Sequence, residues 1–160
     1  MHSMNTPSDA RLMAMTANLM VLSRAYRGAA DKALADFGMS QATAWPVILT
    51  GRLGDGVRQG VLAEALGVEG PSLVRVLDQL VAAGMIERRE DAQDRRAKTI
   101  HLTDAGQVLR ERIEGVLIQL RRQLFDGVSE ADLEVCLRVF DTLKTALGRQ
   151  SAASMEDYRP

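Results

Sequence analysis

The chain has 160 residues, a formal net charge of −1 and a single cysteine, Cys136. This length suits one domain, and no apolar run approaches the roughly 18 residues that a membrane span requires. One cysteine excludes an internal disulfide, and the first ten residues lack the basic start and apolar middle of a secretion signal, so we expect a cytoplasmic protein.

A long helix is predicted over residues 10–34, after a disordered start at residues 1–9. Gly38 is a suitable residue to end it, because glycine readily adopts the left-handed conformation that follows many helices. Apolar residues recur three and four positions apart along the helix, which gives it a seam for packing on another helix. The seam consists of Leu12, Met15, Leu19, Leu22, Tyr26 and Ala29.

A second helix is predicted over residues 41–53, with Ser40 as its N-cap. Pro46 lies inside this range, and proline lacks the N–H that a helix interior needs. We therefore expect either a kink at Pro46 or a helix that begins nearer Trp45. The glycine-rich stretch at residues 51–56 predicts a loop.

Two shorter helices are predicted next, separated by a tight turn. The first covers residues 59–66 and ends at Gly67. The second begins with Pro71 at its first position, where a missing N–H costs nothing, and ends before Gly84. Its apolar face is expected to be buried and consists of Leu73, Leu77, Leu80 and Val81. Its opposite face carries Ser72, Arg75, Val76 and Gln79.

A β-hairpin with a charged tip is predicted from the residues that follow. Two short runs of alternating character, residues 85–90 and 98–102, flank a turn rich in aspartate and arginine. The side chains expected to face a core are those of Ile86, Ile100 and Leu102. Those expected to face water are Arg88, Thr99 and His101.

Two further helices are predicted at the C-terminal end. Thr103 is an N-cap for a long helix that ends near Gly127, and Ser129 with Asp132 resembles a capping box for the final helix. Residues 151–160 are expected to form a loose tail. The apolar stripe of the first helix comprises Leu109, Ile113, Val116, Leu117, Leu120 and Leu124. That of the second comprises Leu133, Cys136, Leu137, Phe140, Leu143 and Leu147.

A helix-turn-helix followed by a charged hairpin is the order of a winged helix, which grips duplex DNA. We therefore expect a mainly α fold with a small β-hairpin, in one domain over residues 10–150. Its DNA-binding lobe is expected at about 55–103, between dimerisation helices at about 10–36 and 104–148. The outer helices carry more apolar surface than the central helices can cover, and the simplest partner for them is a second copy of the chain.

The charge balance does not by itself indicate a nucleic-acid partner. Residues 52–103 contain as many acidic as basic side chains, so this part of the chain has no basic excess. Affinity for phosphate must then come from where the positive charges are placed. The prediction of DNA binding therefore depends on the predicted order of helices and strands and not on net charge.

The central residues resemble the MarR family, and its SlyA-like branch in particular. The similarity lies in Leu62–Val68, Pro71–Leu80, Gly84–Ile86 and Asp94–Thr103, where an Asp-x-Arg wing is followed by Leu-Thr. The resemblance implies a homodimeric transcription factor whose two recognition helices enter successive major grooves of a pseudo-palindromic DNA operator. It also implies that a small aromatic acid or phenol binds between the dimer helices and the DNA-binding lobe.

The residues expected to contact DNA lie on the second of the short helices and on the hairpin. Arginine reads guanine and glutamine reads adenine in the major groove, which suits Arg75 and Gln79. The alternative is that they only solvate an exposed face. The helix set is Pro71, Ser72, Arg75, Val76 and Gln79. The hairpin set is Arg88, Arg89, Asp94, Arg95, Arg96 and Lys98.

Roles within the hairpin set are divided by chemistry. Asp94 and Arg96 match the family's Asp-x-Arg wing, which implies that Asp94 braces a guanidinium while Arg95 or Arg96 enters the minor groove. The three remaining cations, Arg88, Arg89 and Lys98, suit phosphate contacts, with a solvated charged strand as the alternative.

Trp45, Arg24 and Arg27 are the candidate ligand-binding residues. The resemblance places Trp45 where SlyA-like proteins line their ligand pocket, and a core tryptophan is the alternative. A bidentate guanidinium from Arg24 or Arg27 suits a carboxylate, although these residues equally suit solvent or another subunit. We expect Cys136, on an apolar stripe, to be a packing residue and not an oxidant sensor.

Neither an enzyme nor a metalloprotein is expected. The sequence contains no nucleophile, base and acid set, and His2, His101 and the lone cysteine do not form a metal-binding pattern. No cofactor is predicted. Two alternatives to a ligand-released repressor remain open: a SlyA-type activator that counteracts silencing proteins, and a winged helix used for protein–protein contact.

Overall fold

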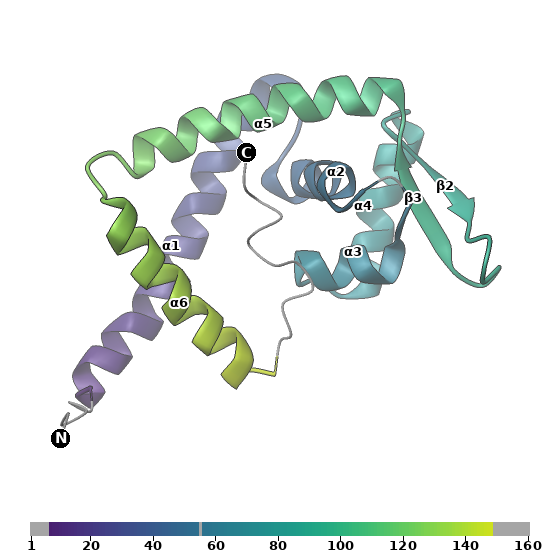
Figure 1. The fold of residues 1–160 in the computed structure, drawn as a ribbon. Helices are drawn as coiled ribbons and strands as arrows, with labels where there is room; N and C mark the ends of the chain where they lie inside the picture. The colour runs from purple at the N-terminus through teal and green to yellow at the C-terminus, as the bar shows by residue number, and fades with distance from the viewer. Residues whose placement is uncertain (1–6, 55, 149–160) are drawn as a thin grey trace.

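The computed structural model describes residues 7–54 and 56–148 (Figure 1). This part of the chain is mainly helical, with one small antiparallel sheet, and confirms the predicted fold class. The helices are α1 (Asp9–Leu34), α2 (Gln41–Leu53), α3 (Gln59–Leu66), α4 (Gly70–Ala82), α5 (Asp104–Leu124) and α6 (Glu130–Ala146), with a 3₁₀ turn at Ala35–Phe37. The strands are β1 (Val57–Arg58), β2 (Ile86–Glu90) and β3 (Lys98–Leu102).

None of these helices is long and apolar enough to cross a bilayer. The predicted loose tail lies outside the described residues, as does most of the predicted disordered start. Helix α1 already begins at Asp9, one residue earlier than expected.

The start of α2 is fixed by two hydrogen bonds that the proline does not disturb. The backbone N–H of Ser40 donates to Thr43 Oγ1 at 3.0 Å, and the N–H of Gln41 donates to Asp31 Oδ1 of α1 at 2.6 Å. These bonds satisfy donors that a helix start leaves unpaired. The helix therefore begins at Gln41, and the alternative of a start nearer Trp45 is wrong.

The predicted loop at residues 51–56 begins three residues later than expected, because α2 continues through Gly51 to Leu53. Helix α5 packs closely here: a Cβ on Gly51 would lie 2.4 Å from Cδ of Arg110. Glycine at this position therefore leaves room for the Arg110 side chain of α5, which the sequence alone does not distinguish from a loop.

The hairpin of β2 and β3 is confirmed, and a third strand extends it. Strand β1 pairs antiparallel with β3, with Val57 opposite Ile100, so the strand order is β1-β3-β2. Strand β1 was not predicted from the sequence. Two residues are too few to show alternation, and their partner lies some forty positions further along the chain.

The core lies between the helices and the inner face of the sheet. Helix α5 packs against α1 and α2. The largest fully buried aliphatic side chains are Leu34, Ile48, Leu49, Leu62, Leu73, Leu77, Ile100, Ile113 and Leu117. The prediction that Val81 is buried is wrong, because it is 41 % exposed while Leu80 occupies the core-facing position.

Thr103 joins the sheet to α5. Its Oγ1 donates to the carbonyl oxygen of Gly84 at 2.7 Å and accepts from the N–H of Gly106 at 3.0 Å. Its own N–H donates to the carbonyl oxygen of Met85 at 3.1 Å. This confirms Thr103 as the N-cap. Ser129 likewise caps α6 by accepting from the N–H of Asp132.

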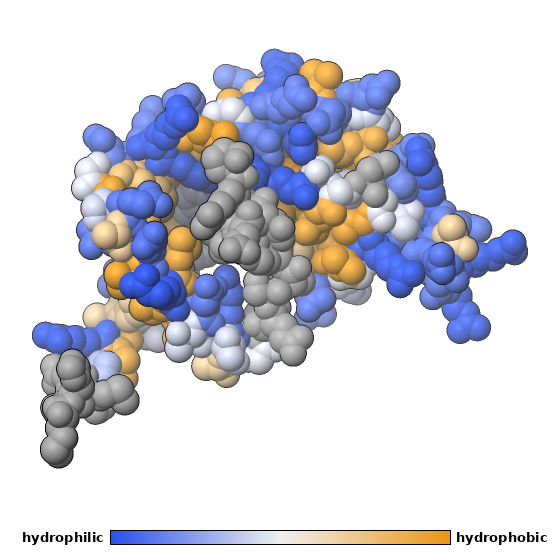
Figure 2. Space-filling model, in the orientation of Figure 1, coloured by the Kyte–Doolittle hydropathy of each residue, from blue (hydrophilic) through white to orange (hydrophobic). Residues whose placement is uncertain are grey.

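Helices α1 and α6 lie on the opposite side of the fold from the wing (Figure 1), and both expose apolar side chains. Orange, apolar atoms are visible on this part of the surface in Figure 2. Cys136 is exposed in the single chain, so its predicted packing role can apply only within an assembly. The larger exposed aliphatic residues here are Leu12, Met13, Met20, Val21, Leu22, Val135 and Leu137.

Candidate nucleic-acid interface

Helices α3 and α4 form a helix-turn-helix that presents one face of α4 outward. Gly67 ends α3 with φ of 65°, a left-handed conformation that glycine adopts without strain. Helix α4 then starts at Gly70, so Pro71 occupies its second position and not the first. Three buried leucines anchor α4, and Arg75 and Gln79 lie exposed on the outside, as do Pro71 and Ser72.

Val76 differs from the other members of the predicted helix set. It is half-buried and packs against the core cluster. Val74, which was not singled out, is 38 % exposed. Val76 therefore borders the core and is not fully on the outer face as expected, because it lies three residues after Leu73 and four before Leu80, both buried.

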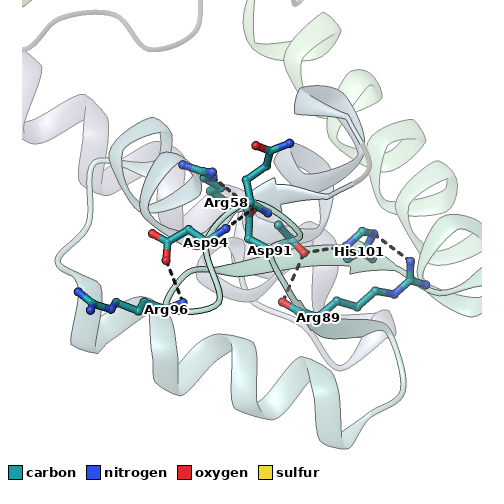
Figure 3. A network of polar contacts seen from close by, with 8 residues as sticks. Arg58, Arg89, Asp91, Asp94, Arg96 and His101 are labelled. Atoms are coloured by element: carbon teal, nitrogen blue, oxygen red, sulfur yellow. Dashed lines mark hydrogen bonds and ion pairs between the residues drawn. The ribbon is translucent and has the colours of Figure 1, made fainter.

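The tip of the wing exposes Arg95, Arg96 and Lys98 to solvent. Asp94 Oδ1 accepts from the backbone N–H of Arg96 at 3.0 Å, a contact that shapes the turn (Figure 3). No guanidinium contact of Asp94 is seen in the described residues. The expected contact between Asp94 and an arginine side chain is therefore not present in the described part of this structure.

Asp91 is the carboxylate that braces a guanidinium. Its Oδ2 accepts from Nε of Arg58 at 2.6 Å, and its Oδ1 accepts from the N–H groups of Gln93 and Asp94 at 2.7 and 3.2 Å (Figure 3). The Arg58 hydrogen bond is the largest of the causes that hold the pKa of Asp91 below its usual value. The same hydrogen bond raises the pKa of Arg58.

The Arg58–Asp91 pair was not predicted from the sequence. Arg58 comes from β1 and Asp91 from the start of the wing turn, 33 positions apart. No local pattern connects them, since the contact exists only after β1 pairs with β3. Whether Asp91 or Asp94 binds the guanidinium depends on the backbone geometry of the turn, which cannot be predicted from the sequence.

Arg88 lies on the inner face of the sheet and is only partly exposed, so the prediction that it faces water is wrong. The register pairs Arg88 with Ile100, and side chains paired across a ladder lie on one face of the sheet. Arg88 also shares the face of Ile86, two positions earlier. Its guanidinium turns onto α4, where Nη1 donates to Asp78 Oδ1 at 2.5 Å.

The strand register places Arg89, Thr99 and His101 on the other face of the sheet, and Figure 3 shows Arg89 and His101 there side by side. Thr99 Oγ1 lies 3.0 Å from His101 Nε2, and Arg89 forms an ion pair with Glu87. Arg89 is exposed, whereas Thr99 and His101 are half-buried, so they face water only in part.

A hollow of about 490 Å³ separates the start of α3 from the wing. Its cations come from both sides, Arg58 from β1 and Arg96 and Lys98 from the wing. Glu64 also lines the hollow, and Arg58 and Lys98 are paired with Asp91 and Glu90, so the charge of the lining is largely balanced.

The predicted ligand residues lie away from that hollow. Trp45 is half-buried on α2, and the guanidinium carbon of Arg121 from α5 lies 5.9 Å from its ring centroid. Arg24 and Arg27 are exposed on α1. Arg121 is not among the residues predicted to bind a ligand.

Comparisons with known proteins agree with this geometry. A family model described as the MarR family matches residues 37–97. A crystal structure of the transcriptional regulator PA3341 is 34 % identical, with a TM-score of 0.78, and the match covers 85 % of this chain and 99 % of that one.

Two further solved structures are similar at 25 % identity. A MarR-family regulator from Rhodococcus sp. RHA1 has a TM-score of 0.73, with 87 % of this chain and 96 % of that one covered. The MepR–DNA complex of S. aureus has a TM-score of 0.75, with coverage of 83 % and 97 %.

Proposed function

This chain belongs to the MarR family of DNA-binding transcriptional regulators, which are not enzymes, and we propose that it is a homodimeric repressor released from its operator by a small aromatic carboxylate or phenol. The observation that carries the proposal is the exposed face of α4 with Arg75 and Gln79, beside a wing tip with Arg95 and Arg96. The further assignment to the SlyA-like branch rests on the sequence motifs alone.

The chemistry of the α4 face supports sequence-specific reading. Arg75 can donate two hydrogen bonds to guanine O6 and N7, and Gln79 can pair with adenine N6 and N7. Arg96 and Lys98 at the wing supply charge for the minor groove and phosphates. That S. aureus MepR was solved with DNA supports the same use of the fold.

The exposed apolar faces of α1 and α6 support a dimer. Leu22 is 63 % exposed and Met20 is 67 % exposed in the single chain, and burying such surface favours association. We propose that residues 10–36 and 104–148 supply the dimer helices. A two-fold dimer then places its two α4 helices on half-sites of a pseudo-palindrome, about 34–36 Å apart.

The effector is proposed from the chemistry of three side chains. The Trp45 ring offers a stacking surface, and Arg24 or Arg27 offers a bidentate partner for a carboxylate. Such a ligand releases DNA only if it binds the DNA-incompetent dimer more tightly than the competent one. A wedge between the dimer helices and the winged lobe meets this condition by changing the spacing of the α4 helices.

The test is a titration of labelled duplex from the upstream region of this protein's own gene, with and without a panel of hydroxylated benzoic and pyridine carboxylic acids. We expect an effective acid to quench Trp45 fluorescence and to lower DNA affinity over the same concentration range. Equal release from a Trp45→Ala, Arg24→Ala double variant would show that the pocket is misplaced. If none of the acids changes DNA affinity, the proposed effector class is wrong, whereas the proposal of DNA binding is unaffected.

The dimer is tested separately by sedimentation at micromolar concentration. A stable folded monomer there would contradict the proposed assembly. Repression is distinguished from activation by transcription from the bound promoter in a purified system, where a repressor lowers the yield of transcript and an activator raises it.

A further inference from the structure

One side chain, Arg88, connects the wing strand β2 to the exposed helix α4. Its Nη1 donates to Asp78 Oδ1 at 2.5 Å, and its Nη2 donates to the carbonyl oxygen of Val74 at 3.2 Å. Val74 and Asp78 are four residues apart and therefore neighbours on the helix surface. The guanidinium thus spans one turn of α4.

Arg88 is held in this position by its surroundings. Its side chain is 26 % exposed, against 56 % for Arg89, the next residue on the same strand. Nε of Arg88 is buried and has no hydrogen-bond partner among the described residues. Ile86 and Ile100, on the same face of the sheet, are buried. Two of the guanidinium nitrogens are thus already hydrogen-bonded to α4.

Asp78 explains why such a contact matters for DNA binding. It lies on α4 next to Gln79 and three residues after Arg75, and its side chain is 59 % exposed. A free carboxylate on a helix that enters the major groove is repelled by the DNA phosphates. Pairing with Arg88 neutralises that charge and ties α4 to the wing at the same time.

We infer that Arg88 is a positioning residue for DNA recognition: it neutralises Asp78 and fixes the orientation of α4 relative to the wing, instead of contacting a phosphate itself. The inference rests on the proposed sequence-specific binding of DNA. It replaces the phosphate contact expected from the sequence, and it assigns Asp78 a role that the sequence analysis did not consider.

A double-mutant cycle tests the inference on a duplex that the parent protein selects from a random-sequence library, with a scrambled duplex for comparison. Arg88→Gln is expected to weaken binding to the selected duplex about tenfold, within the coupling range of contacting residues. Adding Asp78→Asn removes the unpaired carboxylate, and the double variant is expected to bind within about threefold of Asp78→Asn alone.

Arg89→Gln is the matched control, since it removes the same charge from the same strand on the other face of the sheet. Asp78→Asn makes the protein less negative in every background, which raises DNA affinity in general. The same general rise in affinity is therefore expected when Asp78→Asn is combined with Arg89→Gln. A recovery of DNA affinity larger than this general rise is expected only when Asp78→Asn is combined with Arg88→Gln. Urea unfolding of each variant verifies that it is folded, and Arg88→Met, which removes the charge and keeps an apolar stem, replaces Arg88→Gln in the cycle if the latter is not.

The salt dependence separates the two roles of Arg88. The Arg88–Asp78 pair is neutral, so the double variant is expected to keep the parent's slope of log affinity against log salt concentration. A lost phosphate contact would lower that slope by about 1. A lowered slope in the double variant, or no recovery from Asp78→Asn, overturns the inference. If the parent itself selects no sequence, the proposed function fails, and the inference fails with it.

Discussion

Nε of Arg58 lies 2.6 Å from Oδ2 of Asp91, and this contact joins the short strand β1 to the start of the wing turn. Asp91 also accepts two backbone N–H groups of its own turn, so one carboxylate orders the turn and anchors it to the lobe. The position of Arg95 and Arg96 at the wing tip therefore depends on a residue that faces inward.

Asp91→Asn is expected to destabilise the protein at neutral pH. The pKa of Asp91 is lowered in the folded state, so its contribution is fully present above the unfolded value of about 3.9 and is lost as pH falls through the lowered folded value. Urea unfolding from pH 7 to pH 3 measures this. The difference between parent and variant should shrink below about pH 4. A difference independent of pH would contradict the assigned role, and Asp94→Asn serves as the control.

Arg75→Ala is expected to cost about 1–3 kcal/mol of binding free energy per half-site and to relax the base preference at one position. The reason is the loss of two hydrogen bonds to a base edge. Competitive binding to operator variants changed at single positions measures both effects. Arg122→Ala removes the same charge at the end of α5 remote from the wing (Figure 1) and should leave the preference unchanged.

Replacing Arg95 and Arg96 together by alanine is expected to weaken binding to most sequences about equally. These residues are exposed at the wing tip, where charge acts on the DNA backbone and minor groove. The slope of log affinity against log salt concentration should fall by about 2. A slope equal to the parent's would place the wing away from the DNA.

Gly106→Ala is expected to lower the free energy of unfolding by about 1–3 kcal/mol. A Cβ there would lie 1.9 Å from the carbonyl oxygen of Met85, so either α5 or the start of β2 must shift. Urea unfolding measures the loss. Gly115→Ala, in the same helix with no atom within 4 Å of the added Cβ, should instead stabilise the helix by up to about 1 kcal/mol.

The helices and the hairpin were predictable because their signals are local. Ser40, Gly67 and Thr103 mark boundaries within one or two residues of where the structure has them, since caps act through neighbouring backbone groups. The leucine spacing of α4 likewise fixes which of its faces is buried.

Features set by contacts between distant segments were not predictable from those signals. Strand β1 and the Arg58–Asp91 pair depend on pairing with β3. The error at Arg88 has a different origin: residues two apart share one face of a strand, so its parity with Ile86 already indicates the inner face. Arg88 was predicted to face water because it is charged, although its position in the strand indicates the inner face.

The hydrogen bonds of Thr103 make the end of α4, the first residues of the wing and the start of α5 one continuous unit. Helix α5 has 21 residues and is therefore about 30 Å long. A tilt of α5 by about 10° about the end remote from the wing would displace the lobe by about 5 Å. This is more than the 3.4 Å rise of one base pair. A small rearrangement among the outer helices would therefore be enough to take α4 out of register on the DNA, with no change inside the lobe.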